Sequence, residues 1–133
     1  GNHEASGQVA IGNVTRRTQL RGAFQAGLCT ALPAPSLVYP NLVATQPRGR
    51  PRGDCAAALA ENAQSLMINS MVAGVMGQYL VDLLIHRRLT TFATEIDLGH
   101  CTMRSRSITP QQMAQACDTA EHLLIRKETP DEH

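Results

Sequence analysis

The chain has 133 residues, a length that suits one domain with a single hydrophobic core. Its 12 Lys and Arg nearly balance its 11 Asp and Glu, so the overall charge gives no reason to expect nucleic acid or an anionic membrane as partner. The chain contains no Trp, two Tyr and two Phe, which disfavours recognition of single-stranded nucleic acid by base stacking.

The cysteines are scattered and form no CxxC pair, and no signal peptide precedes them. This pattern disfavours a disulfide framework and predicts a cytoplasmic protein with free thiols. Only two histidines, His100 and His122, lie near cysteines, and their spacings match no zinc finger or zinc ribbon. We therefore expect no metal site among Cys29, Cys55, Cys101 and Cys117.

The amino-terminal third predicts little regular structure. Residues 8–12 alternate between polar and small or apolar side chains, which indicates a short strand. Its partners are expected to be missing from this chain, as in a fold that begins upstream. Three prolines between residues 33 and 40 predict an irregular connection with one helical turn. Residues 45–54 hold three Arg, two Pro and two Gly and predict a mobile loop.

A long helix is predicted from Cys55 to about Arg88, because nothing interrupts a run rich in Ala, Leu, Met and Gln. Its apolar residues form two stripes, which predicts a helix that is buried on most sides. Residues 66–85 also have the length of a membrane span. That interpretation is disfavoured because an aspartate such as Asp82 costs about 3 kcal/mol at bilayer depth.

The carboxyl-terminal third predicts a hairpin followed by a helix. Residues 90–98 and 101–108 alternate on either side of Gly99–His100, as in two paired strands. Thr109 and Gln112 form a capping box around Pro110, so a helix should start there and run to about Lys127, with Cys117 on its apolar stripe. Residues 128–133 are expected to be a frayed tail.

Cys55 is the candidate nucleophile of this chain. Asp54 is placed to cap the long helix, which puts Cys55 at its first position. The helix dipole and the loop arginines would lower the pKa of that thiol, whereas the neighbouring Asp54 carboxylate would raise it. No histidine has a defined sequence relation to Cys55, so a passive cysteine at a helix start remains the alternative.

Three stretches in order resemble the carboxyl-terminal half of ThiF-type adenylyltransferases, relatives of ubiquitin-activating enzymes. They are "SGQVAIG" (residues 6–12), "LPAPSLVYPNL" (residues 32–42) and "DCAAALAENAQSLMINSMVA" (residues 54–73). The chain is most similar to the ThiF-like proteins of the bacterial PRTRC gene cluster. The likeness covers roughly residues 1–98.

The resemblance implies an α/β fold: the carboxyl-terminal part of a Rossmann-like ThiF domain, spanning residues 1–133, with a long core helix, a β-hairpin and a terminal helix. It implies a homodimeric enzyme that uses ATP and Mg²⁺ to adenylate the carboxyl terminus of a ubiquitin-like β-grasp protein, with acyl transfer to Cys55 as a candidate step. The family's Gly-rich phosphate turn and its zinc-binding CxxC pairs are missing here. This segment alone is therefore expected to lack the ATP site and to be inactive by itself.

A second hypothesis belongs to another class of protein. The long apolar helix would serve as a non-catalytic interaction or dimerisation module, and Cys55 would be incidental. The reactivity of the Cys55 thiol separates the two hypotheses, because only the first requires activation by the dipole and the arginines.

Overall fold

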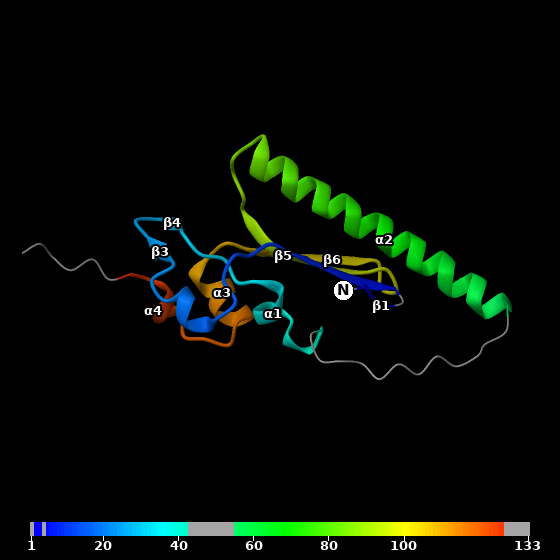
Figure 1. Cartoon of the computed structure of the whole chain (residues 1–133), viewed down its shortest axis with the longest axis horizontal. Coiled ribbons are helices and arrows are strands. Elements are labelled where there is room, and N and C mark those ends of the chain that lie inside the picture. The colour runs from blue at the N-terminus through cyan, green and yellow to red at the C-terminus, as the bar shows by residue number, and fades with distance from the viewer. Residues whose placement is uncertain (1, 4, 43–54, 127–133) are drawn as a thin grey trace, which may run out of the picture.

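The computed structural model describes residues 2–3, 5–42 and 55–126, with side chains described for residues 5–41 and 66–126. The chain is a mixed α/β fold with one helix-covered sheet and a smaller helical lobe (Figure 1). In chain order the elements are β1 (Asn2–His3), β2 (Ser6–Ala10), η1 (Arg17–Leu20), β3 (Phe24–Gln25), β4 (Leu28–Cys29), α1 (Pro35–Val38), η2 (Pro40–Leu42), α2 (Cys55–Leu84), β5 (Thr91–Asp97), β6 (Thr102–Ser107), α3 (Pro110–Ala116) and α4 (Glu121–Leu124).

The main sheet has the strand order β1-β2-β5-β6, and each neighbouring pair is antiparallel. β2 finds its partner far along the chain, with Gly7 opposite Ile96 and Val9 opposite Thr94. The expectation that this strand lacks partners within the chain is therefore wrong. Periodicity identifies a strand but carries no information on which distant strand pairs with it.

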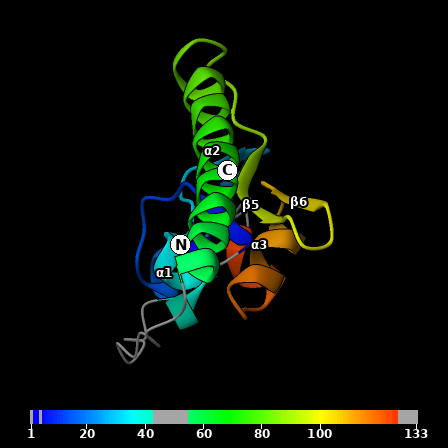
Figure 2. The ribbon, with the colours of Figure 1, turned by 90° about the vertical axis from the view of Figure 1, so that its right-hand side faces the viewer.

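The long helix α2 lies across one face of this sheet (Figures 1 and 2). It begins at Cys55, as predicted, and ends at Leu84, a few residues before the predicted end. Three residues further on, Arg87 has a positive φ of 50°, a backbone conformation that does not continue a right-handed helix. Ile68 and Tyr79 are buried against the sheet, with 0 % and 7 % exposure. In the described stretch from residue 66 onward the remaining sides of α2 are largely exposed, so the prediction of a helix buried on most sides is wrong.

The hairpin prediction is confirmed, because β5 and β6 pair around the turn at residues 98–101. The helix start is also confirmed, since Thr109 Oγ1 accepts a hydrogen bond from the Gln112 backbone N–H at 3.2 Å. The reciprocal half of the predicted capping box is wrong, because the Gln112 side chain accepts from the Ser107 N–H and not from Thr109. The length of that helix is wrong. It ends at Ala116, because Asp118 adopts a left-handed φ of 49° and the Thr119 N–H donates to the Ala114 carbonyl, a Schellman-type end.

The main core lies in the lobe and extends to the near end of β5. Its buried members are Leu20, Ala23, Phe24, Phe92, Ala93, Met113, Ala114, Cys117 and Leu124. Phe92 and Ala93 are neighbours in a strand and would ordinarily face opposite sides of the sheet. Both join this core because the register of the β5–β6 pair shifts between Thr91 and Ala93, as at a β-bulge.

Candidate functional site

Cys55 is the first residue of α2, at the end of the helix that lies farthest from the β5 junction (Figure 1). This placement agrees with the predicted first helical position, where a thiolate is favoured by the helix dipole. The side chain of Cys55, its predicted cap Asp54 and the loop at residues 45–54 lie outside the described part of the chain. The predicted tail at residues 128–133 lies outside it as well.

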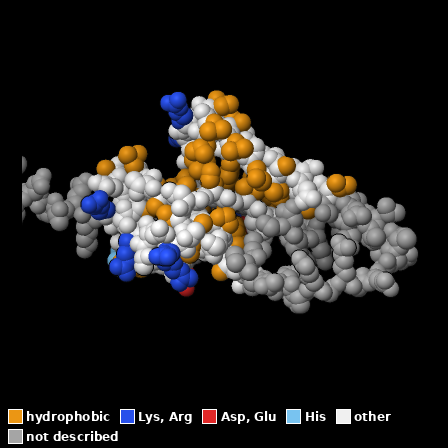
Figure 3. Space-filling view, viewed as in Figure 1, with side chains coloured by type: hydrophobic (Ala, Val, Ile, Leu, Met, Phe, Trp, Pro, Cys, Tyr) orange, Lys and Arg blue, Asp and Glu red, His pale blue; other side chains and the backbone are white. Residues whose placement is uncertain are grey.

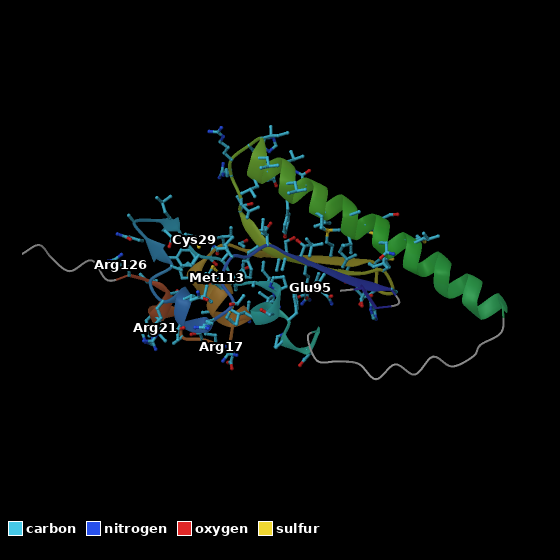
Figure 4. The ribbon with its side chains drawn as sticks, in the orientation of Figure 1. Arg17, Arg21, Cys29, Glu95, Met113 and Arg126 are labelled. Carbon is cyan, nitrogen blue, oxygen red and sulfur yellow. The ribbon has the colours of Figure 1, made fainter. Side chains whose placement is uncertain are left out.

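The thiols of Cys29 and Cys117 belong to the core of the lobe. Cys29 Sγ donates to the Ala31 carbonyl at 3.3 Å and lies 4.0 Å from Met113 Sδ (Figure 4). Burial raises the pKa of the Cys29 thiol more than the Ala31 hydrogen bond lowers it. Burial likewise raises the pKa of Cys117, which is 1 % exposed, so the expectation that Cys117 serves packing is confirmed. Neither thiol is suited to act as a nucleophile near neutral pH.

A row of polar side chains covers the face of the sheet that points away from α2. The side chain of Thr94 points toward α2, because its hydroxyl lies 2.6 Å from the hydroxyl of Tyr79 in that helix. Residues adjacent to Thr94 in the strand therefore point away from α2. Register then sets Gln8, Glu95 and Arg104 in one row and Ser6, Asp97 and Thr102 in the next.

These six residues, which we call the polar sheet face, line a hollow of about 320 Å³. Its two carboxylates and one guanidinium come from adjacent strands, so their spacing is set by the sheet and not by loops. Arg104 makes no ion pair with the residues that the structure describes. The face can therefore offer both a cation and an acceptor to a polar ligand.

Glu95 is the most heavily engaged group on this face (Figure 4). Its Oε1 accepts from the Arg106 guanidinium at 3.1 Å and from the Tyr39 hydroxyl, which follows α1, at 3.2 Å. Arg106 is thus held in an ion pair on the sheet and is not simply solvated. Gln8 Oε1 is buried beside this network and finds no hydrogen-bond partner among the described residues, so it is the acceptor least satisfied by the fold.

Asp97 closes the polar sheet face near the hairpin turn. Its Oδ2 lies 2.7 Å from the His100 ring, and its Oδ1 accepts from the His100 backbone N–H at 3.2 Å. These hydrogen bonds lower the pKa of Asp97 below its ordinary value. The carboxylate is therefore charged through the neutral range, and its role is to hold the turn.

A second hollow lies on the lobe, away from both α2 and the polar sheet face. It has a volume of about 520 Å³ and is lined mainly by Phe24, Ala26, Ile108, Pro110, Ile125 and Arg126. Arg126 donates to the Gln25 side chain at 3.3 Å and forms no ion pair within the described residues (Figure 4). The hollow is apolar with one cation at its rim.

The ionisation of Tyr39 tests whether its hydroxyl is buried against Glu95, as the hydrogen bond between them requires. Burial, and then the negative charge of Glu95, raise the pKa of Tyr39 well above its ordinary value near 10. The group is held protonated in the folded state, so its contribution to stability is complete below about pH 10 and is lost as the pH rises beyond that.

We expect the difference in phenolate absorbance between the unsubstituted protein and Tyr39→Phe to stay flat through pH 10 and to rise only when the protein unfolds. Tyr79 is the remaining tyrosine in the variant and provides the internal reference. If this absorbance difference rises near pH 10, where an ordinary tyrosine ionises, Tyr39 is not buried against Glu95 as described.

The described residues contain no group of three His, Cys, Asp or Glu side chains able to hold a metal ion. They contain one helix, Leu66–Leu84, that is long and apolar enough to cross a membrane by length and composition alone, and 11 % of that stretch is buried.

Sequence reasoning located the start of α2 but missed the polar sheet face. Cys55 carried a recognisable signal, since a helix start and a basic loop meet there. Glu95, Tyr39 and Gln8 come from three separate segments: strand register places Gln8 opposite Glu95, and the packing of the segment after α1 brings Tyr39 to Glu95. The one signal was the polar alternation of β5 and β6, which also describes any half-solvated hairpin. Neither the protein-family models, nor the curated proteins, nor the solved structures contain a match to this chain.

Proposed function

We propose that the chain is the carboxyl-terminal part of a ThiF-like adenylyltransferase of the PRTRC type, which activates the carboxyl terminus of a ubiquitin-like β-grasp protein. The observation that carries the proposal is the order of elements around α2. A strand that carries "SGQVA", an irregular connection and a long helix that begins at Cys55 follow one another as in the resemblance. The sheet also ends on β1, a two-residue edge strand to which further strands could be added.

The described residues do not fit a nucleotide or a magnesium ion. They include no Gly-rich phosphate turn and no group of three His, Cys, Asp or Glu side chains that could hold a metal ion. In this proposal ATP and Mg²⁺ therefore bind to a part of the cytoplasmic, homodimeric enzyme that this chain does not contain. No step through either group is assigned to the residues described here.

The step proposed for this chain is acyl capture. The Cys55 thiolate attacks the activated carbonyl carbon of the partner's terminal glycine, a carbon–sulfur bond forms, and the carbon–oxygen bond to the leaving group breaks. Two observations support Cys55 over Cys29 and Cys117. It stands at a helix start, where the dipole favours the thiolate, whereas burial disfavours the thiolates of Cys29 and Cys117.

The test uses a protein that carries this chain together with the sequence encoded upstream, and a β-grasp protein encoded beside it. We expect ATP–pyrophosphate exchange that depends on the β-grasp protein, and a thiol-sensitive adduct that Cys55→Ser abolishes. Cys101→Ser is the matched control, because Cys101 is an exposed thiol in the β5–β6 turn. Exchange that is absent with every such β-grasp protein would refute the proposal. Exchange with an unchanged adduct in Cys55→Ser would remove the thiol from it.

The exposure of α2 favours a second candidate function, a non-catalytic assembly module. In that case Cys55 should react with a thiol reagent no faster than a model thiol near neutral pH, and no exchange should be seen.

A further inference from the structure

The β6 strand forms a free edge of the main sheet. It pairs with β5 on one side, and no strand in the described part of the chain pairs with it on the other. Residues 102–105, four of its six, are exposed. Figure 2 shows β6 beside β5 at the margin of the sheet, to one side of α2. Such an edge presents backbone groups to which another extended chain can add.

Hydrogen bonds at the end of β6 show which of its backbone groups face outward. The Ile108 N–H donates to the Thr90 carbonyl at 2.8 Å, so Ile108 bonds toward β5. Ser107 bonds away from β5, because its N–H donates to the Gln112 side chain and its carbonyl accepts from the Thr109 N–H. Residues that bond toward β5 and away from it alternate along an antiparallel strand.

Met103 and Ser105 belong to the outward set, because they lie four and two residues before Ser107. Within the described part of the chain, their backbone N–H and C=O groups find no hydrogen-bond partner. The fold thus closes the edge at Ser107, through Gln112, and leaves two donors and two acceptors open beside it. These groups can form the hydrogen bonds of one additional strand.

An arginine gives this edge its charge. Arg104 is exposed on the polar sheet face and forms no ion pair with the residues that the structure describes. Glu95, the carboxylate opposite it in register, is bound by Arg106 instead. Asp97, the other carboxylate on this face, is held by His100. Arg104 is therefore a free cation at the edge, and a carboxylate on an added strand would pair with it.

We propose that the free edge of β6 binds an extended acidic segment of another protein as an added antiparallel strand. Arg104 would face a residue of that segment in a non-hydrogen-bonded pair, with α-carbons about 4.5 Å apart, where cross-strand side chains are closest. The Met103 side chain lies on the opposite face and is 52 % exposed, so it would lie beside an apolar residue. The partner is thus a segment in which acidic and apolar residues alternate.

A second copy of this chain fits the same edge poorly. The antiparallel register that uses both Met103 and Ser105 of each copy would set Arg104 directly opposite its own copy. Like charges directly opposite each other destabilise a strand pair. The arginine therefore disfavours pairing between copies and favours a partner of opposite charge.

Titration of the 133-residue chain with a synthetic peptide tests the proposal. The probe has about eight residues in which glutamate and valine alternate, carries blocked ends and a dye, and is followed by fluorescence anisotropy. We expect saturable binding. The amide hydrogens of Met103 and Ser105 should also exchange with deuterium more slowly in its presence, as NMR measures. The same peptide with lysine in place of glutamate is the matched control and should not bind.

Methylation of the peptide backbone tests the hydrogen bonds. Only the valine amides face β6 in the proposed register, so N-methylation of the valines should abolish binding, whereas N-methylation of the glutamates should change it by less than about threefold. In the chain, Met103→Pro removes an outward N–H but no bond to β5, so the sheet should stay folded. It should weaken binding about tenfold or more, and Met103→Ala should not.

Charge reversal tests the role of Arg104. Arg104→Glu should weaken binding of the glutamate peptide about tenfold and allow the lysine peptide to bind. The valines of the probe could also adhere to α2, whose hydrophobic side chains line the ridge in Figure 3. Leu80→Gln is the control for such adhesion, because Leu80 is 52 % exposed on α2 and glutamine keeps the helix propensity. It should leave binding unchanged.

Four results would overturn the proposal. They are the absence of binding up to about 1 mM peptide, binding that survives methylation of the valines, binding that Leu80→Gln abolishes and Arg104→Glu does not, and self-association of the chain that Met103→Pro abolishes. The last result would assign the edge to a second copy. None of these readouts uses ATP or Cys55, so the edge can bind its partner even if the proposed function fails.

Discussion

Phe92→Ala is expected to lower the free energy of unfolding by about 3–5 kcal/mol, the range for truncating a buried phenylalanine. Phe92 is 0 % exposed and lies in the core with Leu20, Met113 and Leu124. The strand that carries Phe92 is held by hydrogen bonds to β2 on one side and β6 on the other. Those bonds keep the cavity from collapsing.

Urea unfolding followed by circular dichroism measures this effect. Leu28→Ala is the control, since a side chain that is 70 % exposed should change the free energy of unfolding by no more than about 0.5 kcal/mol. Equal losses in the two variants would contradict the assignment of Phe92 to the core.

Gly12→Ala is expected to cost about 3 kcal/mol or more. A Cβ atom at residue 12 would lie 2.0 Å from the Pro33 carbonyl oxygen and 2.6 Å from the Ala34 nitrogen, and both are backbone atoms that no rotamer change can move. This contact is where the chain after β2 pairs with the segment before α1, through the Val14–Pro33 bridge. A single methyl group would therefore force two segments of backbone apart.

Gly74→Ala is the matched control, because it should stabilise the protein where Gly12→Ala destabilises it. Its Cβ would meet nothing within 4 Å, and alanine is favoured over glycine in a helix by about 1 kcal/mol. We expect Gly74→Ala to raise the midpoint of urea unfolding and Gly12→Ala to lower it. A Gly12→Ala midpoint at or above that of the unsubstituted chain would show that the two segments do not approach as closely as described.

Local signals in the sequence were sufficient for the start of α2, the β5–β6 hairpin and the Thr109 cap. Each depends on residues within a few positions of one another: an uninterrupted run of helix formers, alternation around Gly99–His100, and a hydroxyl three residues before its amide. The same kind of signal identified Cys55 as the thiol at a helix start. Its chemical role is still a prediction.

Only the tertiary structure decided which strands pair, which side chains meet and which side of α2 is covered. Helix α3 shows the limit: it ends at Ala116, although the narrow apolar stripe continues past Asp118, whose left-handed backbone terminates the helix. The exposure of α2 shows it again. Hydropathy records that a helix is apolar on several sides, but which of those sides the rest of the chain covers depends on the area of the sheet. The four-stranded sheet covers one side, and apolar side chains on the other sides of the described stretch of α2 stay exposed.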